Sequence, residues 1–122
     1  MSSLQYKIDT KENFDTITPQ MPEIAHNMAD AFFSICEERL KNDKSAIIDF
    51  GNVISMDMRV SNRLAQLHNS FYDADLSLAC CCVQANIRSQ MASHLNIVPT
   101  LDEAIDLVSM EGLERELLGE DE

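Results

Sequence analysis

Hydrophobic and polar positions along the chain switch repeatedly between the two-residue period of a strand and the 3.6-residue period of a helix. The segments that are typical of strands are residues 4–10, 13–18, 46–50, 75–83 and 97–98. The first of them alternates apolar and polar side chains, which predicts a half-exposed strand. The runs at 46–50 and 75–83 are almost continuously apolar, which predicts central strands covered on both faces.

Between these strands, apolar residues recur at helical spacing. The first helix is predicted to begin near Pro22, because proline is tolerated in the first turn, and to continue to Leu40. Asp57 is placed to cap the next helix, and Thr100 with Glu103 forms a capping box before the last one. The remaining apolar stripes are Val60, Leu64, Leu67 and Phe71; Ile87, Met91 and Leu95; and Leu101, Ile105 and Val108.

Strands and helices therefore alternate, which predicts an α/β fold with parallel neighbouring strands and right-handed crossovers. A chain of 122 residues suffices for one continuous core. We expect the domain to span residues 1–111. Residues 112–122 are strongly acidic, and we expect either an acidic C-terminal tail or an extension of the last helix.

Composition restricts the function. Hydrophobic residues make up 45% and charged residues 25%, which is typical of a folded domain. The net charge of −12 repels nucleic-acid phosphates and anionic lipids, so we expect neither as a partner. No apolar run approaches the roughly 20 residues of a membrane helix, and no signal peptide is visible, so we expect no membrane insertion and a cytoplasmic location.

The four cysteines are Cys36 and the consecutive Cys80, Cys81 and Cys82. Strand alternation predicts that Cys80 and Cys82 share one face while Cys81 points to the other. No Cys-x-x-Cys spacing and no paired histidine ligand occurs, so we interpret all four as small buried hydrophobes in a reducing compartment. A zinc site or a disulfide is the weaker alternative, and we predict no metal and no cofactor.

The segment Ala46-Ile47-Ile48-Asp49-Phe50-Gly51-Asn52-Val53-Ile54-Ser55-Met56-Asp57 resembles the signature of STAS domains, in which a strand ending in an acid leads through a small turn to a helix-opening Asp. The segments 14–19, 77–87 and 94–105 resemble the matching parts of the same family, so the resemblance covers roughly residues 4–108. It implies the STAS fold: a mixed four- to five-stranded sheet with about four helices packed mainly on one side.

The resemblance is to anti-sigma factor antagonists. It implies a non-enzymatic module that binds an anti-sigma factor, often a GHKL-type serine kinase, and so acts in the regulation of transcription. In that family the kinase phosphorylates a hydroxyl just after the helix-opening Asp. Here the run is Asp57-Met58-Arg59-Val60-Ser61, which places Arg59 at the acceptor position and Val60 at the family's glycine. Ser61 is the remaining weak candidate for phosphorylation.

The partner-binding residues that we predict are Asp57, Met58, Arg59, Val60, Ser61 and Arg63, with Asp49 at the edge of the site. Arg59 and Arg63 lie one helical turn apart, so they form either a solvated face or a docking site for an acidic or phosphorylated partner. The alternative function is a structural STAS subunit, a scaffold or transporter-regulatory component that self-associates. An enzyme is not expected, because His26, His68 and His94 are dispersed and the chain carries no nucleotide-binding or nucleophile motif.

Overall fold

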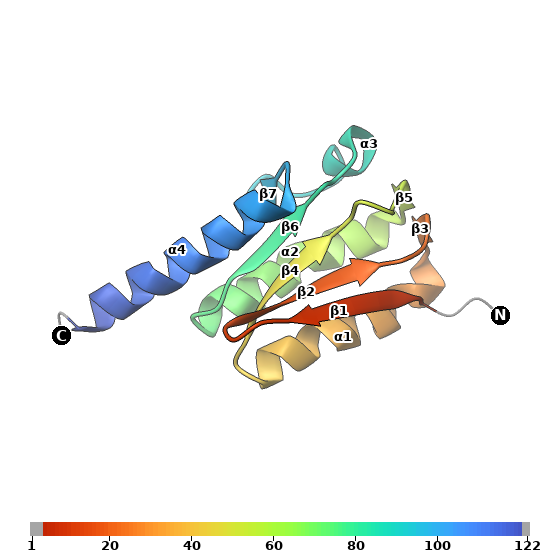
Figure 1. The fold of residues 1–122 in the computed structure, drawn as a ribbon. Helices are drawn as coiled ribbons and strands as arrows, with labels where there is room; N and C mark the ends of the chain where they lie inside the picture. The colour runs from red at the N-terminus through yellow and green to blue at the C-terminus, as the bar shows by residue number, and fades with distance from the viewer. Residues whose placement is uncertain (1–3, 121–122) are drawn as a thin grey trace.

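The sheet that organises the chain is mixed and has five strands in the order β1-β2-β4-β6-β7 (Figure 1). A computed structural model describes residues 4–120, and all statements on the fold refer to this range. β1 and β2 are antiparallel, whereas the other neighbours are parallel. The strands are β1 (Tyr6–Thr10), β2 (Phe14–Pro19), β4 (Ser45–Asp49), β6 (Leu78–Cys81) and β7 (Asn96–Val98).

The helices alternate with these strands. They are α1 (Ala29–Lys41), α2 (Met58–Asp73), α3 (Ala85–Arg88) and α4 (Leu101–Glu120), with a 3-10 turn, η1 (His26–Met28), before α1. Two short segments, β3 (Glu23–Ile24) and β5 (Ser55–Met56), form a separate parallel pair. The predicted α/β architecture is therefore confirmed, with this small second sheet as an addition.

The core has two apolar layers, one on each face of the sheet, and β4 is therefore buried on both sides. Ala46 and Ile48 belong to the larger apolar cluster, which contains the inward sides of α1 and α2. Ile47 points the other way and packs with Ala104 and Val108 of α4. As predicted, most helices cover one face, while α4 alone among the described helices covers the other.

Both long helices on the first face end in the same way. Asp43 after α1 and Asp75 after α2 have φ of 59° and 60°, the left-handed conformation that closes a helix. In each case the following amide donates to a carbonyl five residues back, Lys44 to Arg39 at 3.0 Å and Leu76 to Phe71 at 2.8 Å. Aspartate tolerates this conformation better than most residues with a side chain, which explains how these helices stop without glycine.

The first helix begins later than the sequence predicts. Pro22 is not in its first turn, because the Pro22 carbonyl accepts hydrogen bonds from the amides of Ile54 and Ser55. Ile24 is buried as part of β3, paired with Met56, and α1 starts at Ala29. The tertiary pairing of residues 22–24 with 54–56 thus replaces the first turns that the apolar spacing predicted.

Two further predictions need correction. The helix predicted over the stripe Ile87, Met91 and Leu95 ends at Arg88, although all three side chains are buried, because turns carry the chain onward. Cys82 does not share the face of Cys80: its φ of 60° interrupts the alternation, and its side chain packs with the α4 cluster.

Helix α4 continues through residues 112–120, so within the described range the acidic end is helical. Residues 121–122 lie outside the described residues, and the boundary at residue 111 stays a prediction. Among residues 4–120, no helix combines the length and apolarity needed to cross a membrane.

A buried ion cluster joins β2, α1 and the turn before β4. The carboxylate of Asp15 lies 3.2 Å from Arg39 Nε and also pairs with Lys44 Nζ. The three side chains are only 7%, 9% and 19% exposed, respectively. Removing one member of such a buried cluster leaves the other charges without compensation, which is strongly destabilising.

We predict that Asp15→Asn lowers the free energy of unfolding by about 3 kcal/mol, because it leaves two buried cations facing a neutral amide. Urea denaturation followed by circular dichroism measures this. The matched control is Asp9→Asn, which disrupts the exposed pair of Asp9 with Lys11 and should change the free energy by about 0.5 kcal/mol or less. Equal effects of the two substitutions would contradict the role of the Asp15 cluster.

Candidate functional site

The start of α2 is held in place by backbone hydrogen bonds to β3. The Asp57 amide donates to the Ile24 carbonyl at 3.0 Å, immediately after the pairing of β3 with β5. From the other side, Asn86 Nδ2 donates to the Ile54 carbonyl and Gln90 Nε2 to the Met56 carbonyl, both at 3.0 Å. The segment that leads into α2 is therefore fixed from two directions before any partner is present.

Asp57 caps α2, as predicted. Its backbone is extended, and Oδ1 accepts the Arg59 amide at 2.8 Å. The same carboxylate accepts from the Arg59 guanidinium, through Nε at 3.0 Å and Nη2 at 3.2 Å. These side-chain bonds, followed by the amide bond, hold the pKa of Asp57 below its ordinary value, and the carboxylate in turn raises the pKa of Arg59.

The surface around this ion pair combines charge with exposed apolar groups. The side chain of Arg59 is 63% exposed and that of Asp57 is 27% exposed. Ile54 and Met58 are 54% and 55% exposed, so two large apolar side chains close to the ion pair in sequence face solvent. Ile54 was not among the predicted site residues, because the apolar run 53–54 gave no sign of which side chain would face solvent.

Two of the predicted contact residues face inward. Val60 is fully buried in the larger core cluster, and Ser61 is 1% exposed with its hydroxyl accepting from Gln90 Nε2 at 3.3 Å. Neither side chain is accessible to a partner in the folded domain. The burial of Ser61 also keeps a kinase from its hydroxyl unless the start of α2 opens locally.

Arg63 lies one turn further along α2 but has partners of its own. Its Nη1 donates to Asp30 at 2.9 Å, and its guanidinium carbon lies 4.3 Å from the centre of the Phe33 ring. Its side chain remains 40% exposed. Arg63 thus ties α2 to α1 and still presents part of its cation beside Arg59.

Asp49 ends β4 at the same edge of the sheet but on the opposite face. It follows Ile47 in the alternation of β4, and its register partner is Cys81 of β6. Cys81 is fully buried, and burial is the main cause that raises the pKa of both Cys81 and Cys82. Thiols of this kind stay protonated near neutral pH, which argues against a cysteine nucleophile.

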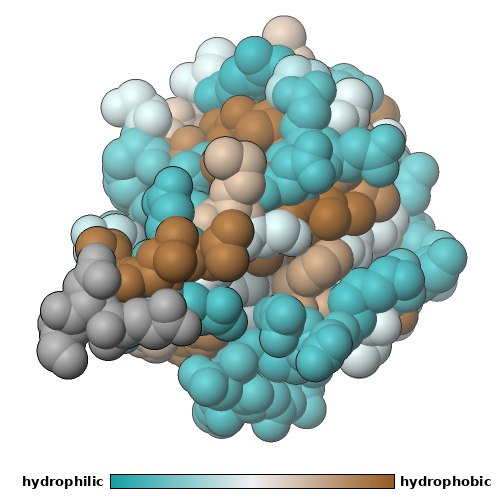
Figure 2. Space-filling model, turned by 60° about the vertical axis from the view of Figure 1, so that its left-hand side comes forward, coloured by the Kyte–Doolittle hydropathy of each residue, from teal (hydrophilic) through white to brown (hydrophobic). Residues whose placement is uncertain are grey.

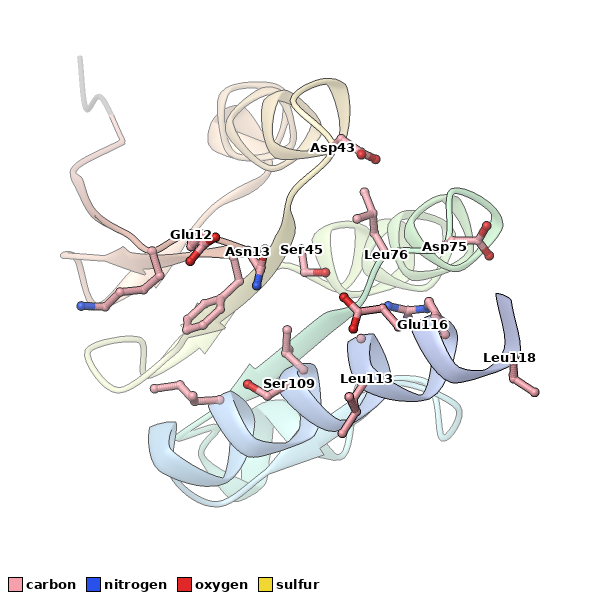
Figure 3. Close-up of a pocket in the computed structure, with 16 residues that line it drawn as sticks. Glu12, Asn13, Asp43, Ser45, Asp75, Leu76, Ser109, Leu113, Glu116 and Leu118 are labelled. Atoms are coloured by element: carbon pink, nitrogen blue, oxygen red, sulfur yellow. The ribbon is translucent and has the colours of Figure 1, made fainter. Parts of the chain in front are cut away.

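A groove lies at the other edge of the sheet, away from the start of α2. It has a volume of about 980 Å³. In Figure 3, α4 forms one wall with Ser109 and Leu113, and the start of β4 with Ser45 and the segment before β6 with Leu76 form the other. The rim charges are mixed in sign and bring no nucleophile next to a base, so this groove is not interpreted as a reaction centre.

Neither a family model nor a curated protein matches this sequence. Solved structures match it by fold. SpoIIAA, an anti-sigma factor antagonist in its unphosphorylated form, aligns with a TM-score of 0.70 and 13% identity over 86% of this chain and 98% of that one. A Thermotoga maritima protein inferred to be an anti-sigma factor antagonist aligns with a TM-score of 0.72 and 18% identity, covering 87% and 94% of the two chains.

The same fold occurs inside a larger protein. The murine anion transporter Slc26a9 aligns with a TM-score of 0.65 and 12% identity over 84% of this chain but only 18% of the transporter. Identities this low establish the fold alone. The chain has the STAS fold, as the sequence predicted, and the function has to be argued from its own surface.

We predict that Asp57→Ala lowers the thermal unfolding temperature by about 4 °C, because the Arg59 amide loses its capping acceptor. Asp57→Asn is the matched control, since asparagine caps equally well and removes only the charge. The pKa of Asp57 is lowered in the folded state, so the contribution of its charge is present above the unfolded pKa and lost as the pH falls through the folded pKa. The wild type and Asp57→Asn should therefore converge in acid, and an unfolding temperature unaffected by Asp57→Ala would refute the cap.

Proposed function

We propose that this chain is a non-enzymatic protein-binding module that docks its partner on the surface formed by Ile54, Asp57, Met58 and Arg59, hereafter the α2 docking surface. The fold is that of proteins that include the anti-sigma factor antagonist SpoIIAA. By this likeness, the partner that we propose is an anti-sigma factor or a GHKL-type serine kinase. Its capture would release a sigma factor and so regulate transcription.

The observation that carries the proposal is the composition of this surface. Ile54 and Met58 are large exposed apolar residues within three positions of Asp57, which forms an ion pair with Arg59. Arginine is enriched among the residues that dominate protein interfaces, and methionine adapts to irregular contacts. The backbone hydrogen bond from the Asp57 amide to the Ile24 carbonyl and the side-chain bonds donated by Asn86 and Gln90 preorganise the segment, which reduces the entropy lost on binding.

Charge gives the surface its specificity. The chain as a whole has a net charge of −12, whereas at this surface the exposed Arg59 and Arg63 are each balanced by one carboxylate, Asp57 and Asp30 respectively. Asp57 engages Nε and Nη2 of Arg59, while the guanidinium has five N–H donors. The remaining donors suit a carboxylate or a phosphate of the partner, and this complementarity sets the orientation of docking.

The proposed docking is not switched by phosphorylation at this site. SpoIIAA has also been solved in a phosphorylated form. In this chain Arg59 occupies the position that resembles the family's acceptor, and Ser61 is buried. A phosphate in an interface acts through its added negative charge, whereas arginine keeps a fixed positive charge at every physiological pH. We therefore expect constitutive binding, controlled by the amount of either protein.

A second candidate function is a structural subunit that associates through α4. Four large apolar side chains on this helix are more than half exposed: Met110, Leu113, Leu117 and Leu118. Figure 2 shows apolar surface gathered beside the end of the chain. Slc26a9 is a case in which a segment of this fold belongs to a transporter. This reading predicts copies of the chain itself, or a membrane-protein complex, as the partner.

The test is a pull-down from the native cytoplasm with three baits, read by mass spectrometry. Wild type and Lys7→Glu should retain one anti-sigma factor or GHKL-type kinase, and Arg59→Glu should lose it at least about tenfold, because the substitution replaces an attracting charge by a repelling one. Lys7 is the matched control: it lies exposed on β1, and its substitution changes the charge equally. Thermal unfolding of each bait establishes that it is folded.

The proposal is contradicted if all three baits retain the same partners, or retain only further copies of the chain. In either case the α2 docking surface is not the contact. A structural subunit that associates through α4 would then be the better-supported function.

A further inference from the structure

Three side chains of types that can ligate a metal meet at the edge of the sheet where β4 and β6 end, on the face that α4 covers. They are Asp49, Cys81 and Cys82, and one ligand atom of each lies within 4.8 Å of the other two. The register explains part of this, because Asp49 is paired directly with Cys81. Among the side chains that the structure describes, residues 4–118, this is the one cluster of three or more metal-ligating residue types at such spacing.

The conformation of Cys82 brings the second thiol into the cluster. An ordinary strand would turn it to the opposite face, beside Cys80. Its φ of 60° is uncommon for a residue other than glycine, asparagine or aspartate, and directs its side chain to the α4 face with Cys81. Such backbone strain is often retained where it serves a site.

Gly51 holds the carboxylate toward the thiols. Its amide donates to Asp49 Oδ1 at 2.9 Å. A methyl group at Gly51 would lie 3.0 Å from that oxygen and 3.7 Å from Cys82 Cβ, so the absence of a side chain keeps this approach open. A hydrogen bond that orients a ligand from behind is a regular feature of metal sites.

We propose that Asp49, Cys81 and Cys82 form a binding site for Zn²⁺. Two thiolates and one carboxylate match the donor types that zinc takes in proteins, and a fourth tetrahedral position remains for water or a further donor. Binding displaces one proton from each thiol to solvent and forms two Zn–S bonds and one Zn–O bond. The three ligands carry −3, so the bound ion leaves one negative charge.

One backbone group favours that residual charge against the effect of burial. The backbone of Leu101, the first residue of α4, lies beside Cys82, and a helix N-terminus favours negative charge. Cys82 and Asp49 are partly exposed, which gives the ion a path from solvent, while Cys81 is fully buried. The sequence predicted no metal site because adjacent cysteines have no recognised ligand spacing, and only the strand register adds Asp49.

The experiment titrates the full reduced chain, freed of metal by a chelator, with Zn²⁺ against a competing chromophoric chelator. We expect one equivalent to bind. Cys82→Gly removes a thiol and suits the positive φ, and Asp49→Asn removes the carboxylate charge at nearly constant shape. Each should raise the dissociation constant at least about tenfold. Cys36→Ala is the matched control, since it deletes a buried thiol on the other face and should leave the constant unchanged.

Co²⁺ supplies the second readout, because ligation by thiolates gives a charge-transfer absorption that carboxylates alone do not. We expect this charge-transfer band in the wild type and in Cys36→Ala, and a clear loss of the band in Cys82→Gly. Circular dichroism establishes that each variant is folded. Failure of the wild type to bind one equivalent of Zn²⁺, or equal affinity in Cys82→Gly and the wild type, would overturn the proposal.

Discussion

The double-sided burial of β4 is the constraint on which the rest of the structure depends. Ile48 is fully buried against the layer of α1 and α2, and Ile47 is fully buried against α4, so a single strand links both halves of the core. A shift of its register by one residue would exchange these faces. The end of β4 also sets the functional geometry, because Asp49 ends the strand on the α4 face and the chain then turns through Gly51 toward the start of α2.

The sequence predicted the elements whose signal is local, and it failed where distant segments compete. The stripe Val60, Leu64, Leu67 and Phe71 and the cap at Asp57 were predicted correctly, because one helix decides them. The start of α1 was wrong, since the pairing of β3 with β5 over 30 residues away in sequence overrides the apolar spacing near Ile24. The position of Cys82 was wrong because the end of β6 depends on a backbone conformation that alternation does not reveal.

The candidate site was also predicted in part: residues fixed by the local helix start were placed correctly, and those that depend on tertiary packing were not. Asp57, Met58 and Arg59 lie where the sequence placed them, at an exposed helix start, whereas Val60 and Ser61 turn inward. Helical geometry accounts for this, because consecutive residues differ by about 100° in direction and only part of any turn faces solvent. The hydrogen bonds from Asn86 and Gln90 to this segment come from the chain after β6, which no pattern in residues 53–63 encodes. Whether the surface binds an anti-sigma factor or a kinase stays a proposal, because the structural likenesses establish the fold alone.

The central claim is that partners dock at the start of α2 rather than along α4. Hydrogen–deuterium exchange of the chain, alone and saturated with a protein partner captured from a native cell extract, tests this docking site. Exchange should slow in residues 54–60, where Met58 and Arg59 are exposed, and should not change in residues 105–118. Protection confined to α4, with exchange at the start of α2 unchanged, would contradict the claim.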